Sequence, residues 1–304
     1  MRASARAEAS ESGGSELAIA DHPGLISVVI PAYNEEGQIE HCLHDTHETL
    51  SAMGARFEVI VVDDGSYDET LSLALLTAEK LGEVRIVTYP ENLGKGFALI
   101  EGAKSARGDL VLFVDADLEV HPRQVAALYQ ALIRSEADVV IGSKLHADST
   151  IDYPLKRRIL SRGYYVLVRT LFRLPVHDTQ TGLKLYRTEV LRRVAGRILV
   201  KRFAFDLEAL VNADRLGYRI VEAPVVVTRE RPYPRVGAAD ALMVARDTLA
   251  IWYRANIRRW YDKVGSEADA AASEGEVALA PEGVPGFARE QMVERRADLE
   301  GRNR

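Results

Sequence analysis

The chain of 304 residues lacks the features of several protein classes. Its single cysteine, Cys42, excludes a disulfide within the chain and gives no support for a metal site of cysteine and histidine. No apolar run approaches the ~20 residues that a membrane-spanning helix needs, and the N-terminus shows no signal-peptide core. We therefore expect a cytoplasmic protein, in solution or peripheral on the cytosolic face of a membrane.

Several catalytic signatures are also missing. The sequence has neither a P-loop nor a two-glycine dinucleotide fingerprint, which argues against a kinase or a dehydrogenase. No set of serine, histidine and aspartate indicates a hydrolase, and the seven histidines are scattered along the chain. The net charge of −6 does not favour nucleic acid as a partner.

The composition divides the chain into an ordered middle and two tails. Residues 1–24 are rich in alanine, serine, glutamate and glycine without periodicity, so we expect a disordered tail. Residues 265–304 are similar and are expected to be largely disordered. Between the tails we expect one large domain over residues 25–232, followed by a C-terminal amphipathic helix within residues 233–264.

Short apolar runs alternate with helical patterns in the first half of the chain. Strands are expected at residues 26–30, 57–62, 84–88, 110–114 and 139–141. Strands alternating with helices predict an α/β fold with a mostly parallel, doubly wound sheet. After Ser143 the alternation stops. Helices are then expected near residues 155–174, 203–216 and 238–261, with strands near 184–186 and 218–227.

The stretch with the most chemical content is residues 110–119. Five apolar residues, typical of a strand buried on both faces, lead directly into Asp115, Ala116 and Asp117. Open α/β sheets bind ligands at the carboxyl ends of their strands. Two carboxylates one residue apart can hold Mg²⁺ or Mn²⁺ and leave positions for phosphate oxygens, and Glu119 could add a third oxygen. Taken alone, the motif more often marks acids that cap a turn.

Four motifs in chain order carry a resemblance to a known family. They read VIPAYNEE at residues 29–36, VDDGS at 62–66, NLGKG at 92–96 and DAD at 115–117. This series resembles glycosyltransferase family 2 and implies the nucleotide-sugar-binding sheet of that family, the glycosyltransferase A-type fold. DTQTGLKLY at 178–186 and FDLE at 205–208 are similar to stretches of dolichyl-phosphate glucosyltransferases. DADL at 115–118 is shared with the dolichyl-phosphate mannosyltransferases.

The resemblance implies that the loops after the first strands bind a nucleotide sugar. Tyr33 would pack on the base, and Glu35 would accept a hydrogen bond from the base or the ribose. Asp63 or Asp64 would accept from the same groups, unless it caps the following helix. Lys95 begins a helix, a position that favours phosphate, and either contacts the diphosphate or is solvated. The implied set is Pro31, Tyr33, Glu35, Asp63, Asp64, Lys95 and Asp115.

The resemblance also implies a metal and a phosphorylated acceptor. Asp115, Asp117 and Glu119 would hold Mg²⁺ or Mn²⁺, which neutralises a leaving nucleoside diphosphate. A phosphate monoester has a second pKa near ~6, so it needs cations to position it rather than a general base. The implied acceptor-binding residues are Lys144, Arg157 and Ser161, and the expected catalytic residues are Asp117, Arg157 and Lys144.

Four further polar residues are candidates for contacts with the sugar hydroxyls: Asp178, Gln180, Asp206 and Glu208. Asp206 and Glu208 are nearly as well explained as acids in the first turn of a helix. The function implied is inverting transfer of a hexose from UDP-glucose or GDP-mannose to a polyprenyl or dolichyl phosphate. Two alternatives stay open, namely a family 2 enzyme with a soluble acceptor and a nucleotide-sugar-binding protein without catalysis.

Two helical segments, residues 155–174 and 238–261, are predicted to dock on a membrane surface. Mixed aromatic and arginine residues suit the headgroup layer. The alternative is that the apolar faces pack on their own domain. In the first segment one face carries Arg158, Arg162, Arg169 and Arg173, and the opposite face carries Leu160, Tyr164, Leu167, Leu171 and Leu174. In the second segment one stripe carries Leu242, Leu249, Tyr253 and Trp260.

Overall fold

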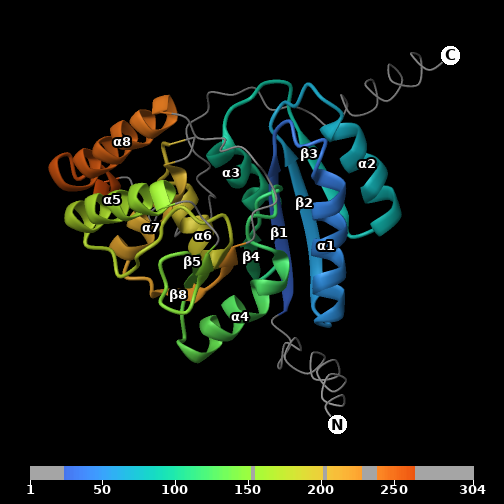
Figure 1. The fold of residues 1–304 in the computed structure, drawn as a ribbon, viewed down its shortest axis with the longest axis horizontal. Helices are drawn as coiled ribbons and strands as arrows, with labels where there is room; N and C mark the ends of the chain where they lie inside the picture. Colours follow the sequence, from blue (N-terminus) through green and yellow to red (C-terminus); the bar gives the residue numbers. More distant parts are fainter. Residues whose placement is uncertain (1–23, 152–154, 201–203, 228–237, 264–304) are drawn as a thin grey trace, which may run out of the picture.

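The computed structural model describes residues 24–151, 155–200, 204–227 and 238–263. Side chains are described for all of these except residues 155–160 and 238–241. Figure 1 shows a central sheet with helices on both faces. Apart from Gly24, the two predicted tails lie outside the described residues.

The main sheet has seven strands in the order β3-β2-β1-β4-β7-β5-β8. All neighbouring strands are parallel except β7, which pairs antiparallel with both β4 and β5. The expected mostly parallel α/β sheet is confirmed, and the inserted antiparallel strand is a feature that the alternating pattern did not predict. The strands are β1 (Leu25–Ala32), β2 (Arg56–Asp63), β3 (Val84–Thr88), β4 (Leu110–Phe113), β5 (Val139–Ser143), β7 (Lys184–Arg187) and β8 (Ile220–Pro224).

Helices cover the two faces of the sheet with separate apolar cores. On one face lie α1 (Ile39–Ala52), α2 (Thr70–Leu81) and α4 (Val125–Arg134), the last preceded by the short helix η1 (Pro122–Gln124). On the other face lie α3 (Lys95–Ser105), α6 (Thr188–Ala195) and α7 (Phe205–Arg215). Because strands β1, β2 and β4 are buried on both faces, they consist of almost uninterrupted apolar runs.

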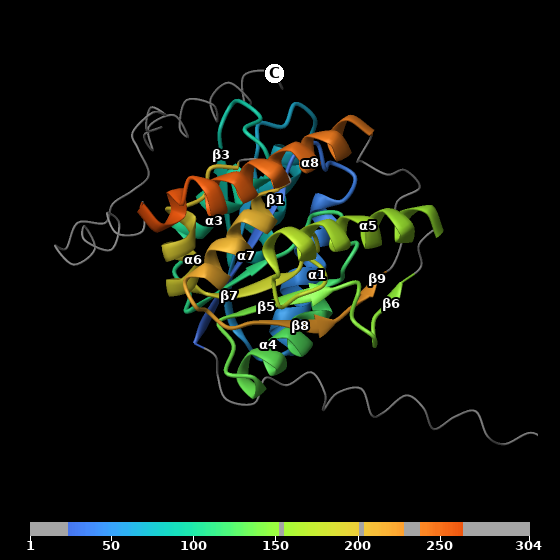
Figure 2. The same ribbon diagram turned by 90° about the vertical axis from the view of Figure 1, so that its left-hand side faces the viewer.

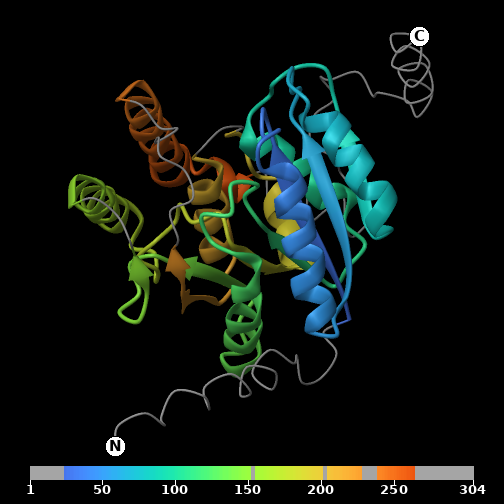
Figure 3. The same ribbon diagram turned by 45° about the vertical axis from the view of Figure 1, so that its right-hand side comes forward.

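Two further helices lie beside each other at one end of the molecule (Figures 1, 2 and 3). They are α5 (Leu155–Phe172) and α8 (Ala238–Trp252), and a π-helical turn, η2 (Tyr253–Ile257), follows α8. Tyr164 of α5 and Thr248 of α8 are joined by a hydrogen bond of 3.2 Å. Ile251 and Tyr261 are buried in the same core as Phe205 of α7, so the C-terminal helix packs into the domain.

Helix α6 and strand β6 (Thr150–Ile151) were not expected from the sequence, whereas β9 (Val226–Val227) lies at the end of the strand region predicted at residues 218–227. Helix α6 starts at Thr188, directly after β7 ends at Arg187. A second, two-stranded sheet joins β6 to β9 in parallel. This small sheet ties the loop after β5 to the strand that follows β8, and both lie near the carboxyl edge of the main sheet.

Candidate active site

Asp115 follows β4 at the carboxyl edge of the sheet and faces Lys95, the first residue of α3. The Nζ atom of Lys95 lies 2.6 Å from Oδ1 of Asp115, and the side chains are 25% and 31% exposed. Burial alone would raise the pKa of the Asp115 carboxyl, but the charges of Lys95, Lys184 and Lys144 hold that pKa below its ordinary value. Asp115 is therefore an ionised carboxylate surrounded by lysines.

The loop before β7 packs directly on Asp115. A Cβ atom built on Gly182 would lie 2.0 Å from Oδ2 of Asp115, so only glycine fits at this position. The loop of residues 178–182 is thereby held against the acidic motif. This contact brings the predicted sugar-binding stretch next to the predicted metal site.

The second acid of the motif, Asp117, accepts one hydrogen bond on Oδ1 from the backbone N–H of Glu119, at 3.1 Å. Among the described residues, no group of three or more histidine, cysteine, aspartate or glutamate side chains is arranged to hold a metal ion. Glu119 itself lies 3.9 Å from the Nζ atom of Lys144. Asp115 and Asp117 nevertheless fit Mg²⁺ or Mn²⁺, because such ions in phosphate-transfer sites take one or two carboxylates and complete their shell with phosphate and water. The third ligand, Glu119, stays a prediction.

Asp63 and Asp64 end β2 and organise the loops beside it. Oδ1 and Oδ2 of Asp64 accept from the backbone N–H groups of Leu93 and Gly94, at 2.8 and 2.9 Å. Burial raises the pKa of Asp64 despite these bonds. Oδ2 of Asp63 accepts from the Thr88 hydroxyl at 2.8 Å. Neither acid caps α2, whose N-cap residue is Glu69; Oδ1 of Asp68 accepts from the backbone N–H of Thr70, the first residue of that helix, at 3.0 Å.

The loop after β1 supplies an aromatic wall. Tyr33 is 36% exposed and meets Tyr67 edge to face, with ring centroids 6.1 Å apart. Tyr67 is 83% exposed and was not among the residues predicted from the sequence. Its signal was its place directly after the VDDGS motif. Glu35 is buried, and its backbone N–H donates to the Thr70 hydroxyl at 2.6 Å. The register of β1 and β2 places Pro31 beside Val62 and Ala32 beside Asp63.

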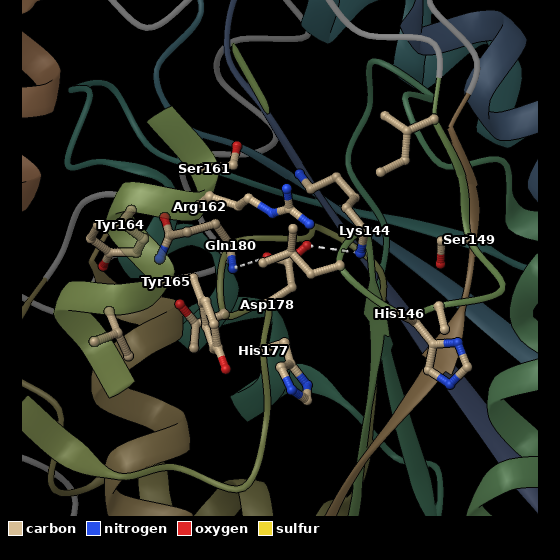
Figure 4. Close-up of a pocket in the computed structure, with 15 residues that line it drawn as sticks. Lys144, His146, Ser149, Ser161, Arg162, Tyr164, Tyr165, His177, Asp178 and Gln180 are labelled. Atoms are coloured by element: carbon tan, nitrogen blue, oxygen red, sulfur yellow. Dashed lines mark hydrogen bonds between the residues drawn. The ribbon is translucent and has the colours of Figure 1, made fainter. Parts of the chain in front are cut away.

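A cavity of about 320 Å³ opens beside this edge (Figure 4). Its walls come from the loop after β5, from α5 and from the loop of residues 177–180. Four predicted residues from two separate groups meet there: Lys144 and Ser161 of the acceptor set, and Asp178 and Gln180 of the sugar set. Arg157 belongs to the part of α5 whose side chains lie outside the described residues, so its predicted role stays untested.

Asp178 also lines the cavity, but its carboxylate serves the loop. Oδ2 accepts from the backbone N–H of Lys144 at 2.9 Å and from the Thr181 hydroxyl at 2.6 Å, and Oδ1 accepts from the backbone N–H of Gln180 at 2.9 Å. Burial would raise the pKa of Asp178, but the Lys144 charge and these bonds lower it. Within the described residues, Nε2 of Gln180 has no hydrogen-bond partner, so this amide can donate to a ligand.

Asp206 and Glu208, at the start of α7, have different surroundings. Oδ1 of Asp206 lies 2.7 Å from Nζ of Lys184, a fully buried lysine that the sequence analysis did not identify. Lys184 also bonds the carbonyl oxygen of Thr181. This ion pair couples α7 to the loop on Asp115, so the Asp206 prediction of a sugar contact remains open.

Glu208 is completely buried and fully bonded. Its carboxylate accepts from the backbone N–H groups of Leu199 and Val200, at 2.9 and 2.7 Å, from Arg254 at 3.1 Å and from the Tyr261 hydroxyl. A carboxylate offers about four acceptor positions, and all of them are used. The assignment of Glu208 to sugar binding is therefore wrong, because this acid anchors the C-terminal helix instead.

Residues 27–195 match the sequence model of the protein family named Glycosyl transferase family 2. The chain belongs to glycosyltransferase family 2. A dolichyl-phosphate beta-glucosyltransferase from Drosophila melanogaster is 34% identical over 260 residues, covering 79% of this chain and 78% of that protein. Glycosyltransferase AglD from Haloferax volcanii is 33% identical over 235 residues, which is 77% of this chain but only 38% of AglD. This family 2 glycosyltransferase thus spans well under half of one of its relatives and most of another.

Solved structures show the same fold. Glucosyl-3-phosphoglycerate synthase from Mycobacterium tuberculosis, in complex with Mn²⁺, UDP-glucose and phosphoglyceric acid, has a TM-score of 0.59 at 25% identity, covering 75% of this chain and 80% of that one. Its complex with Mg²⁺ and UDP has a TM-score of 0.60. The predicted glycosyltransferase A-type sheet is confirmed by this likeness.

In the two segments of this glycosyltransferase that were predicted to face a membrane, only some of the apolar side chains are exposed. In α5 and the residues after it, Val168 and Leu174 are buried in the core. For Leu174 the alternative of packing on its own domain therefore holds. In the C-terminal segment, Leu242 is 73% exposed, Leu249 53% and Tyr253 49%. Among the helices of the described residues, none is long and apolar enough to span a bilayer.

Proposed function

We propose that this family 2 glycosyltransferase moves glucose from UDP-glucose to a polyprenyl phosphate, with inversion at the anomeric carbon and with Mg²⁺ or Mn²⁺. The observation that carries the proposal is the continuity of two sites. The cavity lined by Lys144, Ser161 and Gln180 shares the loop of residues 178–182 with Asp115. A phosphate held in the cavity would therefore face a sugar held at the sheet edge.

The donor half is assigned to the residues at the ends of β1, β2 and β4. Tyr33 and Tyr67 offer ring surfaces for the base, and Asp63 pairs with Ala32, the residue before Tyr33. Lys95, at the N-terminus of α3, would contact the diphosphate together with the helix dipole. Asp115 and Asp117 would hold the metal, which when bound supplies positive charge to the leaving diphosphate.

The acceptor half needs cations rather than a base. An oxygen of the phosphate monoester attacks the anomeric carbon, the bond from that carbon to UDP breaks, and UDP leaves with the electron pair. Because the monoester is largely dianionic at neutral pH, with its second pKa near ~6, no proton has to be removed. One displacement from the face opposite UDP inverts the configuration. Lys144, Ser161 and Arg157 are the proposed positioning residues.

Glucose is preferred to mannose as the transferred hexose on the names of the relatives. Proteins from Drosophila melanogaster and Dictyostelium discoideum, 34% and 30% identical, are both named dolichyl-phosphate beta-glucosyltransferase. The structural neighbour was crystallised with UDP-glucose. UDP-glucose is therefore the first donor to test.

A membrane surface is the proposed source of the acceptor. Leu242, Leu249, Tyr253 and Ile257 are exposed along α8 and η2, and Val166 is exposed on neighbouring α5. Exposed apolar and aromatic side chains beside arginines suit the headgroup layer. We propose the cytosolic face of the membrane. On that face, in a reducing compartment, the lysine-rich site would be open to nucleotide sugars.

A soluble phosphorylated acceptor is the second candidate. The structural neighbour was crystallised with phosphoglyceric acid, which also carries a phosphate monoester. Both candidates can be compared with purified protein, Mg²⁺, labelled UDP-glucose or GDP-mannose, and either a prenyl phosphate or 3-phosphoglycerate. The proposal expects transfer from UDP-glucose to the prenyl phosphate. Transfer to 3-phosphoglycerate alone would establish the soluble alternative, and donor binding without any transfer would favour the non-catalytic one.

A further inference from the structure

Arg162 lines the cavity, although the helical pattern placed it on an outward face with Arg169 and Arg173. The wall that α5 contributes is made of Ser161, Tyr164, Tyr165 and Val168, which share one face of the helix, with Arg162 at its border. Figure 4 shows the side chains of Arg162 and Lys144 extending toward each other across the cavity. Arg162 is therefore a residue of the site and not only of the surface.

The cavity carries an excess of positive charge. Lys144 and Arg162 line it, and Asp178 is the one acid among its lining residues; Glu119, whose carboxylate lies 3.9 Å from the Nζ atom of Lys144, is not part of the lining. The Asp178 carboxylate is already bonded to Thr181 and to the backbone of its own loop. Among the described residues, no carboxylate forms an ion pair with the Arg162 guanidinium. Two cations that face one cavity repel each other, so an anion bound between them would be stabilised by both.

A phosphate monoester fits these cations better than a carboxylate or an uncharged sugar would. The guanidinium group of arginine is planar and bonds two phosphate oxygens at once, whereas lysine acts as a point charge. The Ser161 hydroxyl and Nε2 of Gln180, which has no hydrogen-bond partner among the described residues, add neutral donors on the same cavity. Tyr164, Tyr165 and Val168 give the cavity an apolar side suited to a chain attached to the phosphate.

We propose that Arg162 and Lys144 form a two-cation clamp on the acceptor phosphate, with Arg162 as its bidentate partner. This inference rests on the proposed function, because it names a binding residue for the acceptor of that reaction. It also reassigns Arg162 from membrane docking to substrate binding. The clamp requires a phosphate monoester and does not depend on the length of the chain that carries it.

The test measures binding of geranyl phosphate, a short soluble prenyl monophosphate, by titration calorimetry with UDP and Mg²⁺ present. A soluble probe removes membrane docking from the result. Arg162→Gln should weaken binding by about tenfold to a hundredfold, the usual range for a lost charged hydrogen bond. UDP binding should be unchanged, and Arg162→Lys should recover part of the affinity. Arg134→Gln is the charge-matched control, since Arg134 is exposed in the last turn of α4 at the opposite edge of the sheet.

The outcomes separate this inference from the proposed function. If wild type transfers glucose to geranyl phosphate and Arg162→Gln binds that phosphate as tightly as wild type, the clamp is wrong and the function stands. If wild type binds geranyl phosphate but transfers nothing, while Arg162→Gln loses binding, the clamp stands and the function fails. Equal loss of UDP and geranyl phosphate by Arg162→Gln would overturn the assignment to the acceptor. No binding of geranyl phosphate to wild type would overturn both.

Discussion

The Nζ atom of Lys95 lies 2.6 Å from Oδ1 of Asp115, the first acid of the DAD motif. An ammonium group and a metal ion cannot occupy the same position on one carboxylate oxygen. We therefore expect Lys95 to compete with a bound divalent metal for Asp115. A bound diphosphate would relieve the competition, because it offers Lys95 another anionic partner next to the start of α3.

Lys95→Met should change metal binding and nucleotide binding in opposite directions. Without the competing ammonium, Mn²⁺ alone should bind more tightly by about tenfold, the equivalent of ~1.4 kcal/mol. UDP in the presence of Mn²⁺ should bind more weakly, because the diphosphate loses a cation. Calorimetric titration measures both. The control is Lys104→Met. Lys104 lies in the last turn of the same helix and forms an ion pair with Glu101. Unchanged Mn²⁺ affinity in Lys95→Met would refute the competition.

Asp178 should make a pH-dependent contribution to stability. Its pKa in the folded protein is below the ordinary value of 3.8. The ionised carboxylate therefore stabilises the fold above about pH 4, and this contribution is lost as the pH falls through the lowered pKa. Asp178→Asn should be less stable than wild type at pH 7 by about 1–3 kcal/mol, and the difference should shrink toward pH 3.

Urea unfolding at the two pH values measures this difference. Asp148→Asn serves as the control, because Asp148 belongs to the neighbouring loop and its side chain is 81% exposed. If Asp178→Asn and wild type differed in free energy of unfolding by the same amount at both pH values, the bonds to Lys144 and Thr181 would not depend on the charge of the Asp178 carboxylate.

Glu208→Ala should destabilise the fold rather than alter sugar recognition. The change leaves the Arg254 guanidinium and two backbone N–H groups without their buried acceptor, at a cost of about 3–5 kcal/mol. Thermal unfolding should show a clearly lower midpoint, while Glu189→Ala, at an exposed position in the first turn of α6, should unfold like wild type. A Glu208→Ala protein of normal stability that binds donor poorly would restore the sugar-binding assignment.

The sequence predicted the sheet and its binding edge because those features are local. Runs such as Leu110–Phe113 are apolar throughout since both faces are buried. Parallel strands place the residues that follow them at one edge, so Asp63, Lys95 and Asp115 were expected at the same edge; β2 and β4 both pair with β1, and Lys95 contacts Asp115 directly. The strand order was not predictable in the same way, because nothing in the residues of β7 states that it inserts antiparallel between β4 and β5.

Residues whose roles depend on distant partners were missed or misplaced. Lys184 resembles any strand lysine until Asp206 is brought to 2.7 Å by α7. Glu208 resembles a first-turn helix acid until the C-terminal Arg254 and Tyr261 reach it. A helical wheel gives the faces of α5 but not the neighbours of each face, so it did not show that Arg162 borders the cavity.

The exposed apolar stripe of α8 should carry membrane binding. Leu242→Glu combined with Leu249→Glu should weaken co-sedimentation with anionic liposomes, since both leucines are more than half exposed. The matched control is Leu75→Glu with Leu76→Glu on α2, also exposed but on another face of the molecule. Wild-type binding should fall at high salt, where arginines lose their attraction to the anionic lipids. A wild-type protein that stays in the supernatant at low salt would exclude peripheral docking.

The most direct test of the account is the structure of the product. Purified protein, Mg²⁺, UDP-glucose and geranyl phosphate should give a glucosyl phosphodiester, and proton and phosphorus NMR report both the new bond and the anomeric configuration. The account predicts the β-anomer, inverted from the α-linked donor, and no product when EDTA removes the metal or when Asp117 is changed to Ala. An α-anomer, a product linked through anything other than the phosphate oxygen, or full turnover in EDTA would contradict it.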